Sequence, residues 1–501
     1  MTISAGVTTM NNFDVSSLKP VAKACLSWHL LPRAWRLIAG ACVATSLLSA
    51  CSLIPAYERP AAPVPAQYPG AVGAVNAPLQ AADVPWQDLF KDARLKRLIG
   101  LALFNNRDLR VAMLNIEQTR AQWQLRRADE LPTVNAGISG TRTTSTTGIN
   151  STYNAGFSVT PLTAFELDLF GRVRALSQAG QAQWLASQEA RRAVHISLVG
   201  SVANAYVSWV TDDALLRLAM ATLATRQESL RLTQLKFEHQ AASRLDVNQA
   251  ESLMETAKVA QAQLQRQRAQ DENALALLIG QALPENLPEG LPLNAPEFLA
   301  EVPAGLPSDL LIRRPDVRQA EQLLMAQQAN IGAARAAFFP RITLTGSAGI
   351  VGNDLGQLFS TGARAWTFTP QLLMPIFDAG RNQANLDAAT VGRDIAVAQY
   401  EKVVQTAFRE VADALVARTT FDEQRRAQQA VLAAEESRMA MVELRDRQGL
   451  ANAFEVLDAR RSLFAAQQAA LQTHTQQLQS WVTLYKVLGG GWTEPAVIGF
   501  N

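Results

Sequence analysis

The spacing of apolar residues along the chain switches between two periods, and it does so twice. Val134, Ala136 and Ile138 alternate with polar or small residues, and residues 341–350 show the same alternation. A period of two predicts strands with one apolar and one polar face. Each strand has an expected partner after a polar or glycine-rich hairpin loop; the partners are residues 155–160 and 363–373, and the loops are residues 143–151 and 352–362.

Two long stretches that predict helices follow each pair of expected strands. Residues 173–237 contain no proline, and apolar residues recur there every seven positions, a period typical of coiled coils: Val202, Trp209, Leu216, Leu223, Leu230 and Phe237. A helix over residues 173–237 extends about 100 Å, more than an ordinary four-helix bundle needs. The other expected helices are residues 244–279, 381–447 and 452–488, with breaks at 240–243 and 448–451.

The two halves of the chain resemble each other in sequence. The correspondence has an offset of 208 or 209 residues, and it pairs Asp108 with Asp316 and Gly171 with Gly380. A repeat of this length contains several elements, so it is a duplicated half rather than a solenoid unit. The duplication predicts that each half contributes equivalently to an assembly with rotational symmetry.

The expected strands fit two environments. Strands of about ten residues with alternating faces suit a membrane barrel, or a soluble sheet with one face on a core. Four strands are too few to close a membrane barrel, because the smallest known barrels have about eight strands and open edges are not tolerated in lipid. If the strands lie in a membrane, several chains must share the barrel, and three copies supply twelve strands.

The first 50 residues predict an export signal. Basic residues precede a short apolar run over residues 37–50, an order that fits a signal peptide rather than a membrane-spanning helix of about 20 residues. The run ends in Leu-Ser-Ala-Cys, which resembles the lipobox of bacterial lipoproteins and implies cleavage before Cys51 and acylation of Cys51. An unmodified Cys51 after a plain secretory signal is the alternative. Ser52, where an Asp would indicate the inner membrane in that class, favours the outer membrane.

Composition and motif spacing exclude several classes of function. The net charge is only +2 and no basic block is present, which argues against a nucleic acid partner. The proline- and alanine-rich residues 52–85 predict an extended, flexible tether. Nucleotide-binding fingerprints are missing, and the histidines lack metal-ligand spacing: His29, His195, His239 and His474. We therefore expect no catalytic residue, metal or cofactor.

Four segments in order together resemble the TolC-like outer membrane factor family: residues 165–176, 310–349, 375–386 and 484–492. With the lipobox, the resemblance is to its OprM/NodT-type efflux lipoprotein branch, and it covers residues 55–492. It implies an α+β membrane protein in which a homotrimer shares a twelve-stranded β-barrel, four strands per chain, continued by a long periplasmic α-helical barrel.

The resemblance also implies how the chain is divided. The expected parts are a signal peptide (1–50), a lipid-anchored N-terminal tether (51–90), a first repeat (91–280), an inter-repeat equatorial segment (281–310), a second repeat (311–492) and a C-terminal tail (493–501). Strands are expected at about 133–165 and 341–376, and helices at about 173–280 and 381–488.

The function that the resemblance implies is the exit duct of a tripartite efflux system. Such a duct passes drugs or other small molecules from an inner membrane pump, often of the resistance-nodulation-division type, and a periplasmic adaptor. It lies in the outer membrane and extends into the periplasm. The exit channel of a type I protein secretion system is an alternative with the same architecture. A lipid-anchored periplasmic coiled-coil protein is another, but it leaves the strands unexplained.

A closure at the periplasmic end is implied as well. The segment AFEVLDARRSLF begins the return helix of the second half, and in the family this stretch lines the constriction. Carried over residue by residue, the gate is Phe454, Asp458 and Arg461, on one face of a helix. Phe454 replaces the usual Leu. Threefold symmetry would make a carboxylate ring that repels itself or binds a cation, with Arg461 of the same or the next chain neutralising it.

The spacing alone leaves a simpler interpretation of this segment open. Asp458 and Arg461 also have the spacing of an ordinary i,i+3 ion pair on a solvated face. The first half has Gln249 at the position of Asp458, so only the second half is expected to gate.

The helix breaks at 240–243 and 448–451 are the expected periplasmic tips. Arg244, Arg445 and Arg447 lie beside them and are candidate contacts to the adaptor, with ordinary polar turns as the alternative.

The lipobox leads to a direct test. Cys51→Ser removes the thiol that acylation requires, so metabolic labelling with palmitate should no longer mark the protein. Retained label on the variant would refute lipid attachment at this residue.

Overall fold

The structure, a computed structural model, describes residues 52–65, 68, 84–147, 150–293, 295, 313–353 and 356–490. The expected signal peptide, Cys51, most of the inter-repeat segment after residue 293 and the C-terminal tail lie outside these residues. The chain forms two compact units. Of the described residues, those within 52–54, 134–172 and 335–376 belong to the β unit, and those within 55–133, 173–334 and 377–490 belong to the helical unit.

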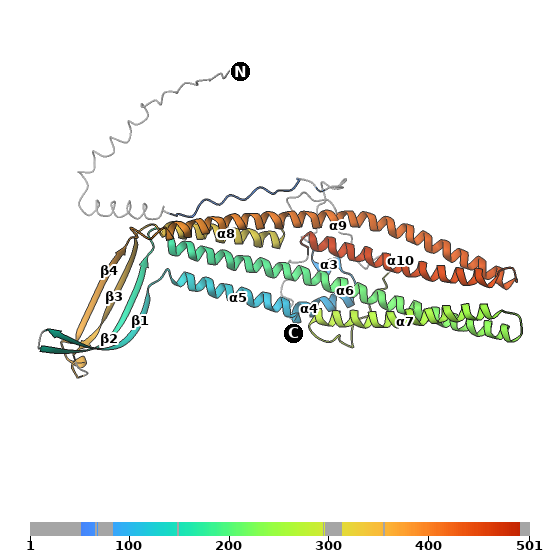
Figure 1. Ribbon diagram of the computed structural model, residues 1–501, viewed down its shortest axis with the longest axis horizontal. Coiled ribbons are helices and arrows are strands. Elements are labelled where there is room, and N and C mark those ends of the chain that lie inside the picture. Colours follow the sequence, from blue (N-terminus) through green and yellow to red (C-terminus); the bar gives the residue numbers. More distant parts are fainter. Residues whose placement is uncertain are drawn as a thin grey trace, which may run out of the picture. The chain divides into compact units, whose positions relative to one another are not determined.

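The β unit is one four-stranded sheet. Its strands are β1 (Thr133–Thr147), β2 (Asn150–Leu167), β3 (Arg341–Gly352) and β4 (Arg364–Leu373), in the order β1-β2-β3-β4 (Figure 1). The β2–β3 and β3–β4 pairs are antiparallel, with Ser347 opposite Leu162 on one side and Thr367 on the other. Strands from the two halves of the sequence therefore pair at the centre of the sheet, and β1 and β4 form its edges.

The first hairpin is longer than the sequence pattern indicated. β1 continues to Thr147 and β2 begins at Asn150, so the expected loop over residues 143–151 is wrong. The reason lies in the run TRTTSTT: β-branched threonine favours extended backbone, so a polar stretch that looked like a loop remains a strand.

Ion pairs and a ring contact hold the base of the sheet together. Glu166 on β2 accepts hydrogen bonds from Arg341 on β3 at 2.7 Å and from two nitrogens of Arg172 at 2.9 and 2.8 Å. The rings of Phe170 and Phe339 stack beside them at 4.6 Å. One carboxylate thus joins the end of β2 to the start of β3, residues that are far apart in the sequence.

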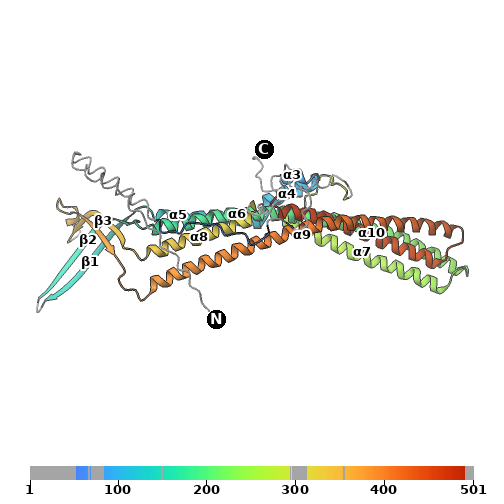
Figure 2. The ribbon, with the colours of Figure 1, turned by 90° about the horizontal axis from the view of Figure 1, so that it is seen from above.

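The helical unit contains short helices and two long helical hairpins (Figures 1 and 2). The short helices are α3 (Trp86–Leu89), α4 (Ala93–Asn105), α5 (Arg107–Ala128) and α8 (Pro315–Ala336). The hairpins are α6 (Arg172–Glu238) with α7 (Arg244–Ile279), and α9 (Arg381–Arg447) with α10 (Ala453–Val487). Both turns lie at the same end of this unit (Figure 2). The long helices α6 and α9 each have 67 residues.

Asp92 connects three parts of the helical unit. It is fully buried and accepts hydrogen bonds from the backbone N–H of Leu95 at 3.0 Å, from the Tyr206 hydroxyl at 3.0 Å and from the backbone N–H of Leu291 at 2.8 Å. Three donors offset the cost of burying the carboxylate. Burial and the neighbouring Asp92 raise the pKa of Tyr206, which keeps its hydroxyl a donor. The start of the inter-repeat segment is thereby fixed to α4 and α6.

Residues 55–59, which we call the N-terminal strap, do not form the free tether that their composition predicted. The Tyr57 hydroxyl and the Arg59 guanidinium both donate to Glu321 on α8, at 2.8 and 2.7 Å. Glu321 is only 6% exposed. Gln328, also on α8, donates to the carbonyl of Ala56 at 2.7 Å. The prediction was wrong because the proline- and alanine-rich composition does not reveal the few polar side chains that bind this extended segment to α8.

Two carboxyl groups meet where α6 packs on α7. Asp212 on α6 and Asp271 on α7 are both half-buried and close enough for each to affect the other's charge. Burial, and then the nearby Asp271, raise the pKa of Asp212 to about 7. The adjacent Asp213 instead binds Arg268 at 2.9 Å and Arg217 at 2.7 Å.

The raised pKa predicts a pH-dependent stability. The folded protein keeps the Asp212 proton up to about pH 7, whereas the unfolded chain releases it near the ordinary aspartate pKa of 3.8. Stability therefore falls as the pH rises through this interval. Asp212→Asn should raise the midpoint of thermal unfolding at about pH 8 and change it little at about pH 4. Asp213→Asn is the matched control and should lower the midpoint at both pH values, since it breaks two ion pairs. Equal gains from Asp212→Asn at both pH values would contradict the assignment.

Candidate functional site

The turns at the ends of the two helical hairpins have the same backbone form. Gln240 and Gly449 occupy equivalent positions and both have positive φ, 61° and 72°. The residue after each donates its N–H to a carbonyl five residues back, Ala241 to Lys236 at 2.7 Å and Leu450 to Arg445 at 2.9 Å. Glycine adopts this conformation without strain, whereas Gln240 adopts it at a cost of about 1 kcal/mol.

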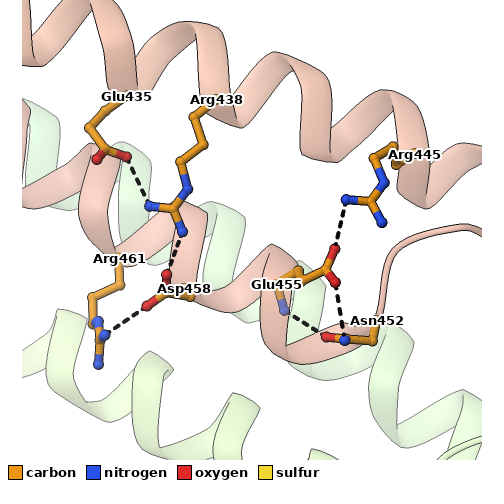
Figure 3. A network of polar contacts seen from close by, with 7 residues as sticks. All are labelled: Glu435, Arg438, Arg445, Asn452, Glu455, Asp458 and Arg461. Carbon is orange, nitrogen blue, oxygen red and sulfur yellow. Dashed lines mark hydrogen bonds and ion pairs between the residues drawn. The ribbon is translucent and has the colours of Figure 1, made fainter.

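The return helix α10 begins with a well-defined N-terminal cap. The Asn452 side chain accepts a hydrogen bond from the N–H of Glu455 at 2.8 Å. Glu455 also forms an ion pair with Arg445 on α9, at 3.2 Å (Figure 3). Arg445 donates to the Leu450 carbonyl at 3.0 Å. The turn is thus fixed from both sides, which determines the direction in which the first residues of α10 point.

One helical turn further on, Asp458 lies between two arginines (Figure 3). Arg461, on the same helix, donates to Asp458 Oδ1 at 2.7 Å. Arg438, on α9, donates to Asp458 Oδ2 and also binds Glu435 at 3.2 Å. The i,i+3 pair that spacing alone suggested is therefore present within one chain. A cross-helix contact to α9 accompanies it.

The charges of this cluster balance. Hydrogen bonding to Arg438, with help from both guanidinium charges, lowers the pKa of Asp458 and keeps it ionised. Two carboxylates and two guanidiniums make Glu435, Arg438, Asp458 and Arg461 neutral as a group. The Asp458 side chain is 25% exposed and that of Arg461 69% exposed, so the carboxylate is turned inward and the guanidinium outward.

The three residues of the predicted gate face one groove. Phe454, Asp458 and Arg461 line it from α10, and Asn248 and Gln249 line it from α7. The groove has a volume of about 360 Å³. Phe454 is 67% exposed within the single chain. The structure therefore brings the predicted residues together and sets them opposite the equivalent segment of the first half.

Sequence reasoning missed Arg438 and Glu435. Arg438 lies 20 residues before Asp458, on the antiparallel helix α9 beyond the turn, and no short motif marks either residue. The comparison of the two halves was a usable signal. At an offset of 209, the first half has Arg226, Ser229, Gln249 and Ser252 where the second has Glu435, Arg438, Asp458 and Arg461.

The first half holds its helices together differently at this level. Arg226 on α6 is buried, donates to the Leu253 carbonyl on α7 at 2.8 Å and lies over the Phe464 ring at 5.4 Å. Burial lowers the pKa of Arg226. At the positions of the carboxylates Glu435 and Asp458, the first hairpin therefore has Arg226 and Gln249.

The three tip arginines have different surroundings. Arg445 is engaged within the turn, as described above. Arg447 has a side chain 77% exposed, with Glu443 at 3.9 Å, and the exposed Arg244 lies over the Phe237 ring at 5.9 Å. Two exposed cations thus flank the tips, one on each hairpin.

The described part of the chain contains no group of three or more His, Cys, Asp or Glu side chains placed to hold a metal ion. His474 has a structural surrounding, since its Nε2 lies 2.7 Å from the Leu293 carbonyl.

Comparisons with known proteins match nearly the whole chain. A family model described as "Outer membrane efflux protein" matches residues 98–281 and 306–490, one segment in each half. The chain is 49% identical to the probable efflux pump outer membrane protein TtgC of Pseudomonas putida, over 90% of this chain and 95% of that protein. It is 43% identical to the outer membrane protein OprJ of Pseudomonas aeruginosa, over 89% and 94%.

Solved structures agree in fold. The open state of the MtrE outer membrane channel of Neisseria gonorrhoeae is similar, with a TM-score of 0.82 and 39% identity over 88% of this chain and 99% of that one. CusC is similar, with a TM-score of 0.80 and 40% identity over 88% and 100%.

Proposed function

The chain belongs to the outer membrane efflux protein family and is the outer membrane exit duct of a tripartite efflux system, and we propose that it works as a homotrimer whose periplasmic end closes at Phe454, Asp458 and Arg461. It acts together with a periplasmic adaptor and an inner membrane pump. We propose a pump of the resistance-nodulation-division type, as the sequence resemblance implies. Curated relatives are named as toluene, solvent and antibiotic efflux proteins. We therefore propose small organic compounds as the exported class.

The main support for the homotrimer is that the four-stranded sheet has two unpaired edges, β1 and β4. Large apolar side chains on the edge strands are exposed, Trp366 by 77% and Val134 by 68%. In lipid, unpaired backbone N–H and C=O groups cost several kcal/mol each, so a four-stranded sheet needs further strands. Copies of the same chain supply them without a second gene product. Three copies give twelve strands, above the minimum of about eight for a barrel.

The attachment of α10 to α9 supports the proposed gate. Arg438 holds Asp458, so the first turns of α10 stay close to α9, and Phe454 and Arg461 remain exposed on the other side. In a trimer these exposed side chains form two rings at the periplasmic end. Breaking the Asp458 contacts frees the start of α10 to move away and widens the passage. Asp458 thus holds α10 against α9 within each chain, and Arg461 forms the charged surface of the closed end.

Single-channel conductance tests the gate. The double variant Asp458→Ala with Arg461→Ala should raise the conductance in planar bilayers, because it removes both the latch and the ring. Arg438→Ala should raise it too, although Arg438 lies on the other helix. Glu228→Ala with Arg231→Ala removes an equally spaced exposed pair on α6 and serves as the control. Unchanged conductance in the first two variants would refute the gate. A rise in the control variant would show that any lost ion pair on the helices raises the conductance.

The tips are the proposed contact to the adaptor. Arg244 and Arg447 are exposed at the turns. Arg445 instead donates to the Leu450 carbonyl and so stabilises its own turn. An adaptor with acidic side chains at its end would complement this pair of cations.

Charge reversal tests the adaptor contact. Arg244→Glu with Arg447→Glu should reduce co-purification of the adaptor by about tenfold or more, as expected for the loss of two charge pairs. Arg217→Glu, an exposed arginine on the shaft of α6, is the matched control and should leave co-purification unchanged. Equal capture by the tip variant and the native protein would refute these contacts.

A further inference from the structure

We infer that Arg226 is the joint between the two helical hairpins, a positioning residue that confines the opening of the periplasmic end to residues 453–461, the first turns of α10. The inference rests on the proposed gate and specifies which part of α10 moves. It follows from a buried guanidinium, an open groove on one side of it and a row of hydrogen bonds on the other.

Arg226 connects three helices. Its side chain on α6 is buried, with the residue only 7% exposed. It donates to the Leu253 carbonyl on α7 at 2.8 Å, and its guanidinium carbon lies 5.4 Å from the centre of the Phe464 ring on α10. Within the described part of the chain, no carboxylate forms an ion pair with it. An apolar side chain would fill this space at lower cost, so the charge is explained by what it holds rather than by packing.

The first hairpin does not need Arg226 to hold its own helices together. Leu230 on α6 packs with Val247 and Ala250 on α7 in a buried apolar cluster. This cluster attaches α6 to α7 close to Arg226. The contact that Arg226 adds is therefore the one to Phe464, which belongs to the other hairpin.

The two hairpins are separated by a groove on the tip side of Arg226. The groove has a volume of about 360 Å³ and is lined by α7 as far as Leu253 and by α10 as far as Arg461. The Leu253 carbonyl binds Arg226, and Phe464 lies less than one helical turn beyond Arg461. The groove thus ends at Arg226, and α10 has room to move only between this point and the tip.

On the other side of Arg226, hydrogen bonds attach α10 to α6. The buried hydroxyls of Thr211 and Thr475 share a hydrogen bond of 2.6 Å. Further from the tip, Gln479 donates to the Ser208 hydroxyl at 2.9 Å. Buried polar groups that lose their partners cost stability, so this part of α10 stays with α6 when the contacts of Asp458 break.

The chemistry of the contact suits a joint. The attraction between a cation and an aromatic face acts within about 6 Å of the ring centre, so Phe464 can tilt without leaving Arg226. Arg226 itself is fixed by its directional hydrogen bond to Leu253. The contact therefore permits rotation of α10 about Phe464 and resists its separation from α7.

The sequence repeat does not reproduce this contact. At an offset of 209, the equivalents of Arg226 and Phe464 are Glu435 and Glu255, two carboxylates that cannot form it. A contact that the packing of the repeat requires would recur in both halves. The joint is instead specific to the place where the first hairpin meets α10, the helix that carries the gate.

Amide hydrogen exchange of the full-length protein, followed by mass spectrometry, tests the joint. Arg438→Ala should accelerate exchange in residues 457–461 by about tenfold or more, because it releases the start of α10, and should leave residues 465–475 unchanged. Adding Arg226→Met, which removes the charge and keeps the length of the side chain, should extend the faster exchange past Phe464. Faster exchange past Phe464 in Arg438→Ala alone, or none in the double variant, would overturn the joint.

The aromatic face is tested in the Arg438→Ala background. Phe464→Leu should extend the faster exchange as Arg226→Met does, whereas Phe464→Tyr keeps the ring and should not. Phe464→Leu combined with Arg226→Met should do no more than either alone, because both remove one contact. Additive effects, or equal effects of Leu and Tyr, would indicate ordinary packing and refute the joint.

A matched control removes a neighbouring charge from the same helix. Arg231→Met breaks an exposed ion pair with Glu228 on α6 and should leave the exchange boundary on α10 unchanged. A shift of the boundary in this control would refute a specific role of Arg226. Native mass measurement first confirms that each variant has the same assembly state as the native protein.

Single-channel conductance separates the joint from the gate. If Arg438→Ala raises the conductance, adding Arg226→Met should raise it further, because a longer part of α10 then moves. No further rise would refute the joint and leave the gate standing. Unchanged conductance in Arg438→Ala would refute the gate, and the exchange boundary at Phe464 then decides the joint by itself.

Discussion

Every other feature depends on the hydrogen-bonding groups along the two open edges of the sheet. In lipid these N–H and C=O groups have no water to bind, and a four-stranded sheet cannot satisfy them alone. The duplication of the chain supplies part of the pairing that the sheet needs. The interface that one hairpin needs toward the next already exists inside each chain, between β2 and β3.

The proposed gate depends on the places where the halves differ. Glu435, Arg438, Asp458 and Arg461 have no charged counterparts of matching sign in the first half, where Arg226 is buried against the Phe464 ring instead. Their turns share one backbone form but differ in the residue that adopts it, since Gly449 takes without strain a conformation that strains Gln240. In the proposed homotrimer, three of the six hairpins would be held by this polar cluster and three by packing, so the proposed gate would move with threefold symmetry.

Local pattern predicted most of the fold, because strand and helix periods can be recognised from neighbouring residues. The expected helices 244–279 and 381–447 match α7 and α9 to the residue, and the fold class is confirmed by solved channels. The failures have two causes. The strand through the threonines before Thr147 was missed because a polar run was taken for a loop. The strap bound to Glu321 and the contact of Arg438 with Asp458 instead depend on residues of other helices, which the pattern along one segment does not contain. The family resemblance gave Phe454, Asp458 and Arg461, and spacing alone gave only the ion pair between Asp458 and Arg461. The register between two helices is needed to find Arg438.

The N-terminal segment also determines a height. Arg335, six residues before the first residue of β3, donates to the carbonyl of Leu53 at 3.4 Å. Leu53 is two residues from Cys51, a span of about 7 Å at most. If Cys51 carries the acyl chains that its lipobox predicts, their point of attachment would lie within that distance of the Leu53 carbonyl. Such a lipid would limit how far the sheet can insert, at the level where β3 begins.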